Sequence, residues 1–308
     1  MNNKYTFIHN INSDNGLSTL EKIAYLGLNI INNWLIPNTH RIYKNKNFVR
    51  DFRIEISKLD WDKLRNNVSV TRKLSDLFWL KLPWKLMHSE LRQINVLDIG
   101  CGSGEYGKIL QSLSGNRINK YKGIDLVLND NWKGLQESYN NFTFEQINSP
   151  NIVDFIPKDT NLIISQSSFE HIDEDLSYFN QLSQFIQSHS NKNIIQIHLL
   201  PASITLFLTL IHGIRQYNQR TISKITKIFN PFSYSVLFKL GGNKCNSLHF
   251  NYITIPIVRK KRNLFPYNQD YNLKVLESIK GDMLKSQKFP NSYALIIHSN
   301  AIRNIFQL

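Results

Sequence analysis

The sequence predicts an α/β fold in which a mostly parallel sheet carries helices on both faces. From residue 94 onward, strand-like and helix-like segments alternate, beginning with an apolar run at 94–99 and a helical segment after residue 104. Such alternation is typical of parallel strands joined by crossover helices. An apolar fraction of 42% supplies enough side chains for a packed core.

Local patterns define the elements of this sheet in order. We assign strands to short apolar runs that end in polar residues, and helices to segments whose apolar side chains recur every three or four positions. The predicted strands are INVLDIG (94–100), YKGIDL (121–126), FTFEQINS (142–149), TNLIISQSS (160–168) and NIIQIHLL (193–200), followed by two late strands, LHFNYITIPI (248–257) and SYALIIHSNAI (292–302). The predicted helices between them are EYGKILQSL (105–113), NWKGLQESYN (131–140) and DEDLSYFNQLSQFIQSH (173–189).

Residues 1–93 are interpreted as a helical N-terminal extension, and residues 94–308 as the α/β domain. Ser18 and Glu21 have the spacing of a capping box before the apolar helical pattern that ends at Pro37. A second helical region, 60–92, is interrupted near a proline. After the fifth strand of the domain we expect a helical insertion at about residues 201–230.

Charge is unevenly distributed along the chain, whose net charge is +14. Residues 1–93 carry +7 (15 basic and 8 acidic side chains), residues 94–200 carry −5 (7 and 12), and residues 201–308 carry +12 (15 and 3). An acidic centre with basic flanks indicates either surfaces for an anionic partner or merely a solvated exterior.

The cysteine content and the hydropathy point to a cytoplasmic protein. Two cysteines cannot form a disulfide framework and favour a reducing compartment. No signal peptide is recognised at the N-terminus, and no apolar run reaches the ~18 residues of a transmembrane helix.

A glycine-rich turn, VLDIGCGSGEYG (96–107), joins the first strand of the domain to its helix, which is the setting of a nucleotide-binding loop. Its glycines follow a G-x-G-x-G pattern, whereas a dinucleotide site has G-x-G-x-x-G. Asp98 precedes the loop and would repel a pyrophosphate but attract an ammonium group. Asp125 ends the next strand, 21 residues after Gly104, where a carboxylate can accept hydrogen bonds from ribose hydroxyls. Together these features favour S-adenosylmethionine over NAD.

Three segments resemble motifs of the class I S-adenosylmethionine-dependent methyltransferases. VLDIGCGSGEYG is similar to their first motif, GIDL (123–126) to their second acidic motif, and LIISQSSFEHIDEDL (162–176) to their fourth-strand region. The resemblance covers roughly residues 90–200 well and the remainder loosely. It implies a Rossmann-like, doubly wound, mostly parallel seven-stranded sheet that binds S-adenosyl-L-methionine.

The resemblance also implies a set of cofactor contacts. The glycine loop would line the methionine and ribose portion, Asp98 would face the methionine amine, and Asp125 would hold the ribose hydroxyls. Leu126, Asn148 and Ser149 would contact the adenine, with Asn148 standing where an aspartate is common. The full cofactor set is Asp98, Gly100, Cys101, Gly102, Gly104, Asp125, Leu126, Asn148, Ser149, Ser165 and Gln166.

Two histidines and one glutamate are candidates for acid–base work on an oxygen nucleophile. His171 follows the fourth strand and His198 ends the fifth, and the carboxyl ends of parallel strands are where ligands bind in such sheets. Glu170 would act as a base or orient one of the histidines. No His, Cys or carboxylate pair has metal-ligand spacing, so no metal is expected.

Residues 199–229 combine an apolar stretch with cations at helical spacing. Three interpretations remain open: a helix lying on an anionic membrane surface, a substrate lid, and a helix packed against the extension. Within this segment, His212, Arg215 and Tyr217 are the candidate substrate-binding residues.

The function expected from the sequence is O-methylation of a small-molecule or glycan-type substrate. One alternative is an RNA methyltransferase that uses the basic C-terminal portion, including RKKR at 259–262, although no RNA-binding module is recognised. The other is a non-catalytic cofactor-binding protein. The expected location is the cytoplasm, and in the membrane-surface interpretation residues 199–229 would contact the inner face of the membrane.

Overall fold

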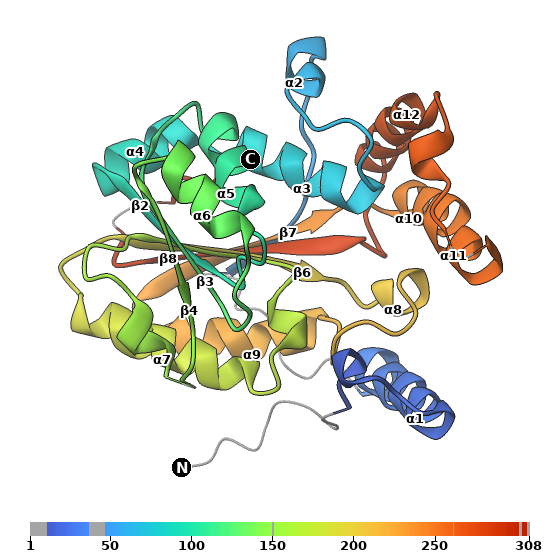
Figure 1. The fold of residues 1–308 in the computed structure, drawn as a ribbon, viewed down its shortest axis with the longest axis horizontal. Coiled ribbons are helices and arrows are strands. Elements are labelled where there is room, and N and C mark those ends of the chain that lie inside the picture. The colour runs from blue at the N-terminus through green and yellow to red at the C-terminus, as the bar shows by residue number, and fades with distance from the viewer. Residues whose placement is uncertain (1–10, 37–46, 150, 261, 302–303, 307–308) are drawn as a thin grey trace.

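The computed structural model describes residues 11–36, 47–149, 151–260, 262–301 and 304–306. Within these residues the strands form one eight-stranded sheet with helices on both faces (Figure 1). The strand order is β1-β7-β8-β6-β5-β2-β3-β4. Neighbouring strands are parallel except at β8, which runs antiparallel to both β6 and β7. The predicted Rossmann-like, mostly parallel α/β architecture is confirmed.

The bounds of the elements are as follows. The strands are β1 (Asn47–Asp51), β2 (Ile94–Ile99), β3 (Ile118–Asp125), β4 (Phe142–Gln146), β5 (Leu162–Gln166), β6 (Ile194–Pro201), β7 (Ser233–Leu240) and β8 (Ser292–Ser299). The helices are α1 (Thr19–Ile30), α2 (Lys58–Asp62), α3 (Val70–Lys81), α4 (Trp84–Leu91), α5 (Glu105–Leu113), α6 (Asn131–Ser138), α7 (Asp175–Ser188), α8 (Thr205–Leu208), α9 (Gln219–Phe229), α10 (Asn243–His249), α11 (Ile255–Lys260) and α12 (Tyr271–Met283).

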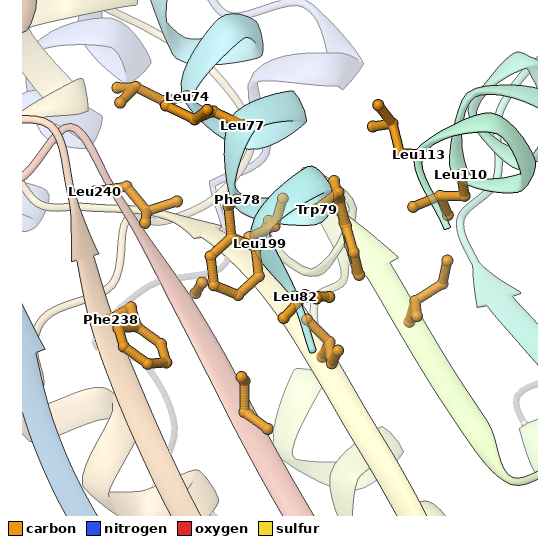
Figure 2. Close-up of a cluster of buried hydrophobic side chains, with 14 of the residues drawn as sticks. Leu74, Leu77, Phe78, Trp79, Leu82, Leu110, Leu113, Leu199, Phe238 and Leu240 are labelled. Carbon is orange, nitrogen blue, oxygen red and sulfur yellow. The ribbon is translucent and has the colours of Figure 1, made fainter. Parts of the chain in front are cut away.

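Two apolar layers sandwich the sheet. In the view of Figure 1, α3 to α6 lie above it and α7 and α9 below it. The upper layer includes Leu74, Phe78 and Trp79 of α3, which pack near Phe238 and Leu240 of β7 (Figure 2). The lower layer gathers apolar side chains of α7 and α9 against the opposite face of the strands. Because α3 belongs to the N-terminal extension, the extension shares the core of the α/β domain.

The extension differs from the sequence expectation in one respect, because it is not wholly helical. Its segment Asn47–Asp51 forms β1, which pairs in parallel with β7 and raises the number of strands to eight from the seven expected. The capping box of α1 is present, since Ser18 Oγ accepts from the Glu21 N–H and the Glu21 carboxylate accepts from the Ser18 N–H. The break near Pro83 separates α3 from α4.

One predicted strand is wrong. Residues 248–257 lie within the helical run from α10 to α11, and the strand that pairs with β8 is instead β7. The N-terminus of α10 is capped from a distance: Asp282 accepts hydrogen bonds from the backbone N–H groups of Lys244 and Cys245, each at 2.9 Å. Because this capping carboxylate lies 37 or more residues away, the local pattern does not reveal where the helix begins.

Candidate active site

A cavity of about 470 Å³ opens at the carboxyl ends of the central parallel strands. The glycine loop after β2, the end of β5 and the end of β6 all contribute to its wall, as expected for a ligand site in a sheet of this type. The N-terminal half of α3 and the segment between β6 and α9 also contribute, as do His249 of α10 and Ser292 at the start of β8. The cavity therefore joins the predicted cofactor loop to residues of the extension and of the insertion.

Each glycine of the loop has a backbone conformation that disfavours other residues. Gly100, Gly102 and Gly104 have φ values of +72°, +54° and +78°. A Cβ on Gly100 would lie 2.4 Å from Ser168 Cβ, and a Cβ on Gly104 would lie 2.4 Å from Phe144 Cε1. A Cβ on Gly102 would meet no atom within 4 Å. Gly102 thus lines open space in the cavity wall, whereas its two neighbours are required for packing.

Asp98 lines the cavity from the end of β2. Its side chain is buried, and its Oδ2 accepts a 2.5 Å hydrogen bond from the Tyr121 hydroxyl. Burial raises the pKa of Asp98 to about 7, the Tyr121 hydrogen bond opposes this rise, and the Asp125 charge adds to it. An ammonium group in the cavity would stabilise the charged form. Cys101 also lines the cavity, and burial raises the pKa of its thiol, so the thiol stays protonated.

Asp125 fixes the glycine loop to the end of β3. Its carboxylate accepts hydrogen bonds from the Gly102 N–H at 2.7 Å and from the Val127 N–H at 3.1 Å. Each carboxylate oxygen retains a second lone pair for a ribose hydroxyl. Leu126 is 60% exposed, and both Asn148 and Ser149 are at least partly exposed, so these three side chains are accessible at the edge where an adenine is expected, although none of them lines the cavity.

The structure does not bring Ser165 or His198 to the cavity. His198 is fully buried on β6, its Nδ1 lies 2.8 Å from Ser165 Oγ, and its ring packs edge-on against Phe169 and Phe179. On β6 the residues that line the cavity are Leu199, Leu200 and Pro201, which lie nearer the carboxyl end of the strand than His198 does. Burial lowers the pKa of His198 to about 3, so the imidazole is neutral. Its observed contacts are those of a core residue.

Gln166, by contrast, reaches the cavity wall. Its side-chain oxygen accepts a 2.8 Å hydrogen bond from the Trp79 indole N–H. This bond ties the end of β5 to α3 and hence to the extension.

Two of the three predicted substrate-binding residues are also internal. Arg215 is fully buried and donates to the carbonyls of Ile172 and Asp173, both at 2.6 Å. It also forms an ion pair with Asp175 at 3.2 Å, and the Tyr217 hydroxyl donates to the same carboxylate at 2.8 Å. Arg215 and Tyr217 therefore hold the insertion against the loop that precedes α7, and of the three only His212 lines the cavity.

Glu170, His171 and His212 come together at one end of the cavity. Glu170 and His212 are in the cavity wall, and the rings of His171 and His212 meet edge-on with their centroids 4.7 Å apart. Burial raises the pKa of Glu170 to about 7, and partial desolvation at the cavity wall lowers the pKa of His212, whose side chain remains accessible to solvent. Of the three catalytic candidates predicted from the sequence, Glu170 and His171 lie at or beside the cavity and His198 does not.

The extension supplies cavity residues that the sequence did not identify. The cavity is also lined by Thr71, Arg72 and Ser75 in the N-terminal half of α3, by its N-cap Ser69, and by Arg65. The guanidinium of Arg65 is occupied by a bidentate pair with Asp76, at 2.6 and 2.8 Å. Arg72 is exposed to the cavity side and brings a cation to it. No local motif marks these residues, because only tertiary packing brings α3 to the cavity.

The cationic helix of the insertion does not lie on the surface with its apolar face free. In α9, Ile222, Ile225 and Phe229 are buried in the lower apolar layer. Arg220 is also buried and donates to the backbone and side-chain oxygens of Asn32 at 2.8 and 2.6 Å. Of the three interpretations of residues 199–229, packing against the extension is the one that these contacts match. Within the described residues, no helix combines the length and the apolar character needed to cross a membrane.

Comparisons with known proteins give fold matches alone. No protein-family model matches the sequence, and no curated protein matches it. Among solved structures, the plantazolicin methyltransferase BamL, in complex with a triazolic desmethylPZN analog and SAH, is 15% identical, with a TM-score of 0.43 over 80% of this chain and 100% of that chain. A SAM-dependent methyltransferase from Archaeoglobus fulgidus is 16% identical, with a TM-score of 0.39 over 70% and 94% of the two chains.

A third match is the CMeT domain of the citrinin polyketide synthase, which is 10% identical, with a TM-score of 0.42 over 75% of this chain and 54% of that chain. The mostly parallel α/β sheet that the resemblance to class I methyltransferases implies is formed by the described residues themselves. The activity and the substrate of this chain are argued below from its own residues.

Proposed function

We propose that this protein is an S-adenosylmethionine-dependent methyltransferase that methylates an oxygen of an anionic small molecule or glycan. The observation that carries the proposal is a single cavity lined by an open glycine, a buried carboxyl and an exposed guanidinium. Gly102, Asp98 and Arg72 all line it. Gly102 and Asp98 suit the methyl donor, and Arg72 suits the acceptor.

The residues of the glycine loop fit the cofactor. Backbone at Gly102 can be approached closely because no side chain occupies the space above it. Asp98 is a buried carboxyl without a cationic partner among its hydrogen bonds, and the methionine ammonium would supply one. Asp125, held by two backbone N–H groups, presents a fixed carboxylate for the ribose hydroxyls. A pyrophosphate would be repelled by Asp98, which argues against a dinucleotide.

Methyl transfer forms an oxygen–carbon bond on the acceptor as the sulfur–carbon bond of the donor breaks, which leaves S-adenosylhomocysteine. The proton of the acceptor hydroxyl passes to a base, for which Glu170 in the cavity wall is the candidate. S-adenosylmethionine, when bound, supplies a methyl group that is already activated. The task of the protein is then mainly to align acceptor and donor. Glu170 and His212 form the polar end of the cavity near the glycine loop, and we place the reacting hydroxyl there.

The acceptor is expected to carry a negative charge because Arg72 faces the cavity beside three hydroxyl side chains, those of Ser69, Thr71 and Ser75. Guanidinium and hydroxyl groups suit a phosphate or a carboxylate. This cation replaces Arg215, which the sequence suggested for the same purpose and which is committed to internal contacts.

A methyl-transfer assay tests the proposal. With labelled S-adenosylmethionine as donor, sugars bearing a phosphate or carboxylate should accept label, and their neutral counterparts should accept less. The substitution Arg72→Ala should raise KM for the charged acceptors with little change in cofactor affinity. Arg259→Ala is the matched control, because Arg259 is exposed on α11 and does not line the cavity.

The same two variants separate the alternatives. An RNA methyltransferase using the basic C-terminal portion would label RNA with a steep salt dependence and would lose activity in Arg259→Ala rather than in Arg72→Ala. A non-catalytic protein would bind the cofactor but transfer no label to any acceptor.

A further inference from the structure

We propose that Glu170, His171 and His212 form a binding site for a divalent transition-metal ion at the end of the cavity. The three side chains each offer one ligand atom, and these atoms all lie within 4.8 Å of one another. Two imidazoles and one carboxylate are a ligand set that suits zinc and its neighbours in the first transition row. The sequence predicts no metal because His212 is 41 residues from His171 and no local spacing links them.

The distances between the ligand atoms are close to those of a bound site. Ligands of a tetrahedral zinc ion with bonds of about 2.1 Å are separated by roughly 3.4 Å. The ligand atoms would have to approach one another by at most about 1.4 Å. Side-chain rotation can provide this, because His171 and His212 are both accessible to solvent.

A buried oxygen of Glu170 lacks a partner, which is the second observation that points to a ligand. Glu170 is 1% exposed, and its Oε2 accepts no hydrogen bond among the described residues. Buried carboxylate oxygens normally have a hydrogen-bond donor or a cation. A metal ion between this oxygen and the two imidazoles would satisfy it.

Asp14 completes the arrangement from the N-terminal extension. Its Oδ2 lies 2.7 Å from Nδ1 of His171, which fixes a tautomer with the Nε2 lone pair available to a metal. A carboxylate bonded to the far nitrogen of a ligating histidine is a recurrent feature of metal sites, because it orients the ring and increases its basicity. Asp14 would therefore be a positioning residue and not a ligand.

Backbone hydrogen bonds hold the three contributing segments together. The Ile214 N–H donates to the Glu170 carbonyl at 2.7 Å, and the Ser13 N–H donates to the Gly213 carbonyl at 3.1 Å. Gly213 has a φ of +62°, and a Cβ there would lie 2.7 Å from the Glu170 carbonyl oxygen. The close approach that brings His212 to Glu170 thus requires a glycine.

The position of the ion suggests its role, and this role rests on the proposed function. Three protein ligands leave at least one coordination position open, and Glu170 and His212 face the cavity. An acceptor oxygen bound at that position would be oriented toward the glycine loop and would lose its proton more readily. Metal binding itself does not depend on methyl transfer and is measured separately.

The test is a calorimetric titration of the full chain with Zn²⁺ after removal of metals by a chelator. We expect saturable binding of one ion per chain and no comparable binding of Mg²⁺, which prefers oxygen ligands. Loss of a residue that orients a metal ligand typically weakens metal binding roughly 10- to 100-fold, and Asp14→Asn should weaken Zn²⁺ binding by about that amount. His171→Ala and His212→Ala each remove a ligand and should weaken Zn²⁺ binding by more. His212→Ala keeps the backbone carbonyl that accepts from the Tyr25 hydroxyl at 2.8 Å, so the fold is preserved.

His88→Ala is the matched control, because His88 is an exposed histidine on α4 that does not line the cavity. Its Zn²⁺ affinity should equal that of the unmodified chain. The proposal is overturned if no one-to-one binding occurs, or if His88→Ala weakens binding as much as His212→Ala. A chain that binds S-adenosylhomocysteine but not Zn²⁺ would overturn the metal site alone, and the reverse result would overturn the cofactor assignment alone.

Discussion

Substituting alanine at two glycines of the same loop separates the part of the loop that serves folding from the part that serves the ligand. Both Gly102 and Gly104 have positive φ, so each alanine costs about 1–2 kcal/mol in backbone strain. At Gly104 the new methyl would also lie 2.4 Å from Phe144 Cε1 and 3.0 Å from Leu135 Cδ1. The Phe144 ring cannot move freely, because it is stacked on Trp132 with centroids 5.5 Å apart.

Overpacking of this kind adds about 1–3 kcal/mol. We therefore expect Gly104→Ala to lower the free energy of unfolding by about 2–5 kcal/mol and Gly102→Ala by about 1–2 kcal/mol. Both variants share the backbone strain and the unfolded-state effect of a glycine-to-alanine change. The difference between their free energies of unfolding therefore measures the steric clash with Phe144 and Leu135. Urea denaturation followed by circular dichroism measures it, with calorimetric titration of S-adenosylhomocysteine as the second readout.

In the titration with S-adenosylhomocysteine, Gly102→Ala should have the larger effect of the two variants. Gly102→Ala places its methyl in the open space of the cavity wall and should weaken cofactor binding in a chain that remains folded. Equal losses of stability in the two variants, or unchanged cofactor affinity in Gly102→Ala, would refute the division of roles between the two glycines.

Three further predictions concern individual side chains. Asp125→Ala should lower affinity for S-adenosylhomocysteine and leave the fold intact, because it removes only two hydrogen bonds at a partly exposed site. An equal loss of affinity in Asp130→Ala would show that the effect comes only from the change in net charge. The raised pKa of Asp98 means that the folded chain retains a proton between pH ~4 and ~7 that the unfolded chain releases, so this group lowers stability as pH rises through that window. Binding of a ligand ammonium group should release this proton, about half a proton per chain at pH 7. The release is detected because the measured binding enthalpy then depends on the ionisation enthalpy of the buffer. In Asp98→Asn the binding enthalpy should not depend on the buffer. His198→Ala should cost about 2–4 kcal/mol of stability through a cavity and an unpaired Ser165 hydroxyl, with cofactor affinity retained; unchanged stability with lost turnover would restore His198 as a catalytic candidate.

The fold and the cofactor half of the site could be predicted because their signals are local. Apolar runs followed by turns mark the strands from β2 to β6, and the glycine pattern with Asp98 lies within one strand–turn–helix unit. Strand β1 was missed because it is a short segment of the extension that is recognisable only by its pairing with β7.

The acceptor half of the site depends on contacts between distant segments. Arg72 reaches the cavity because α3 packs across the sheet, and His212 reaches Glu170 because a glycine allows two backbones to meet. Arg215 has the chemistry of a substrate-binding residue, but the buried Asp175 already engages it. The position of His198 at the end of a strand was visible in the sequence, whereas the face of the strand on which it lies was not, because β6 is buried on both faces.

The most direct test of the central claim is a calorimetric titration of the purified chain with S-adenosylhomocysteine, with NAD as the control ligand. The account predicts saturable binding of one S-adenosylhomocysteine per chain and no binding of NAD, because Asp98 favours an ammonium group and repels a pyrophosphate. Binding of NAD in preference to S-adenosylhomocysteine, or binding of neither ligand, would contradict it.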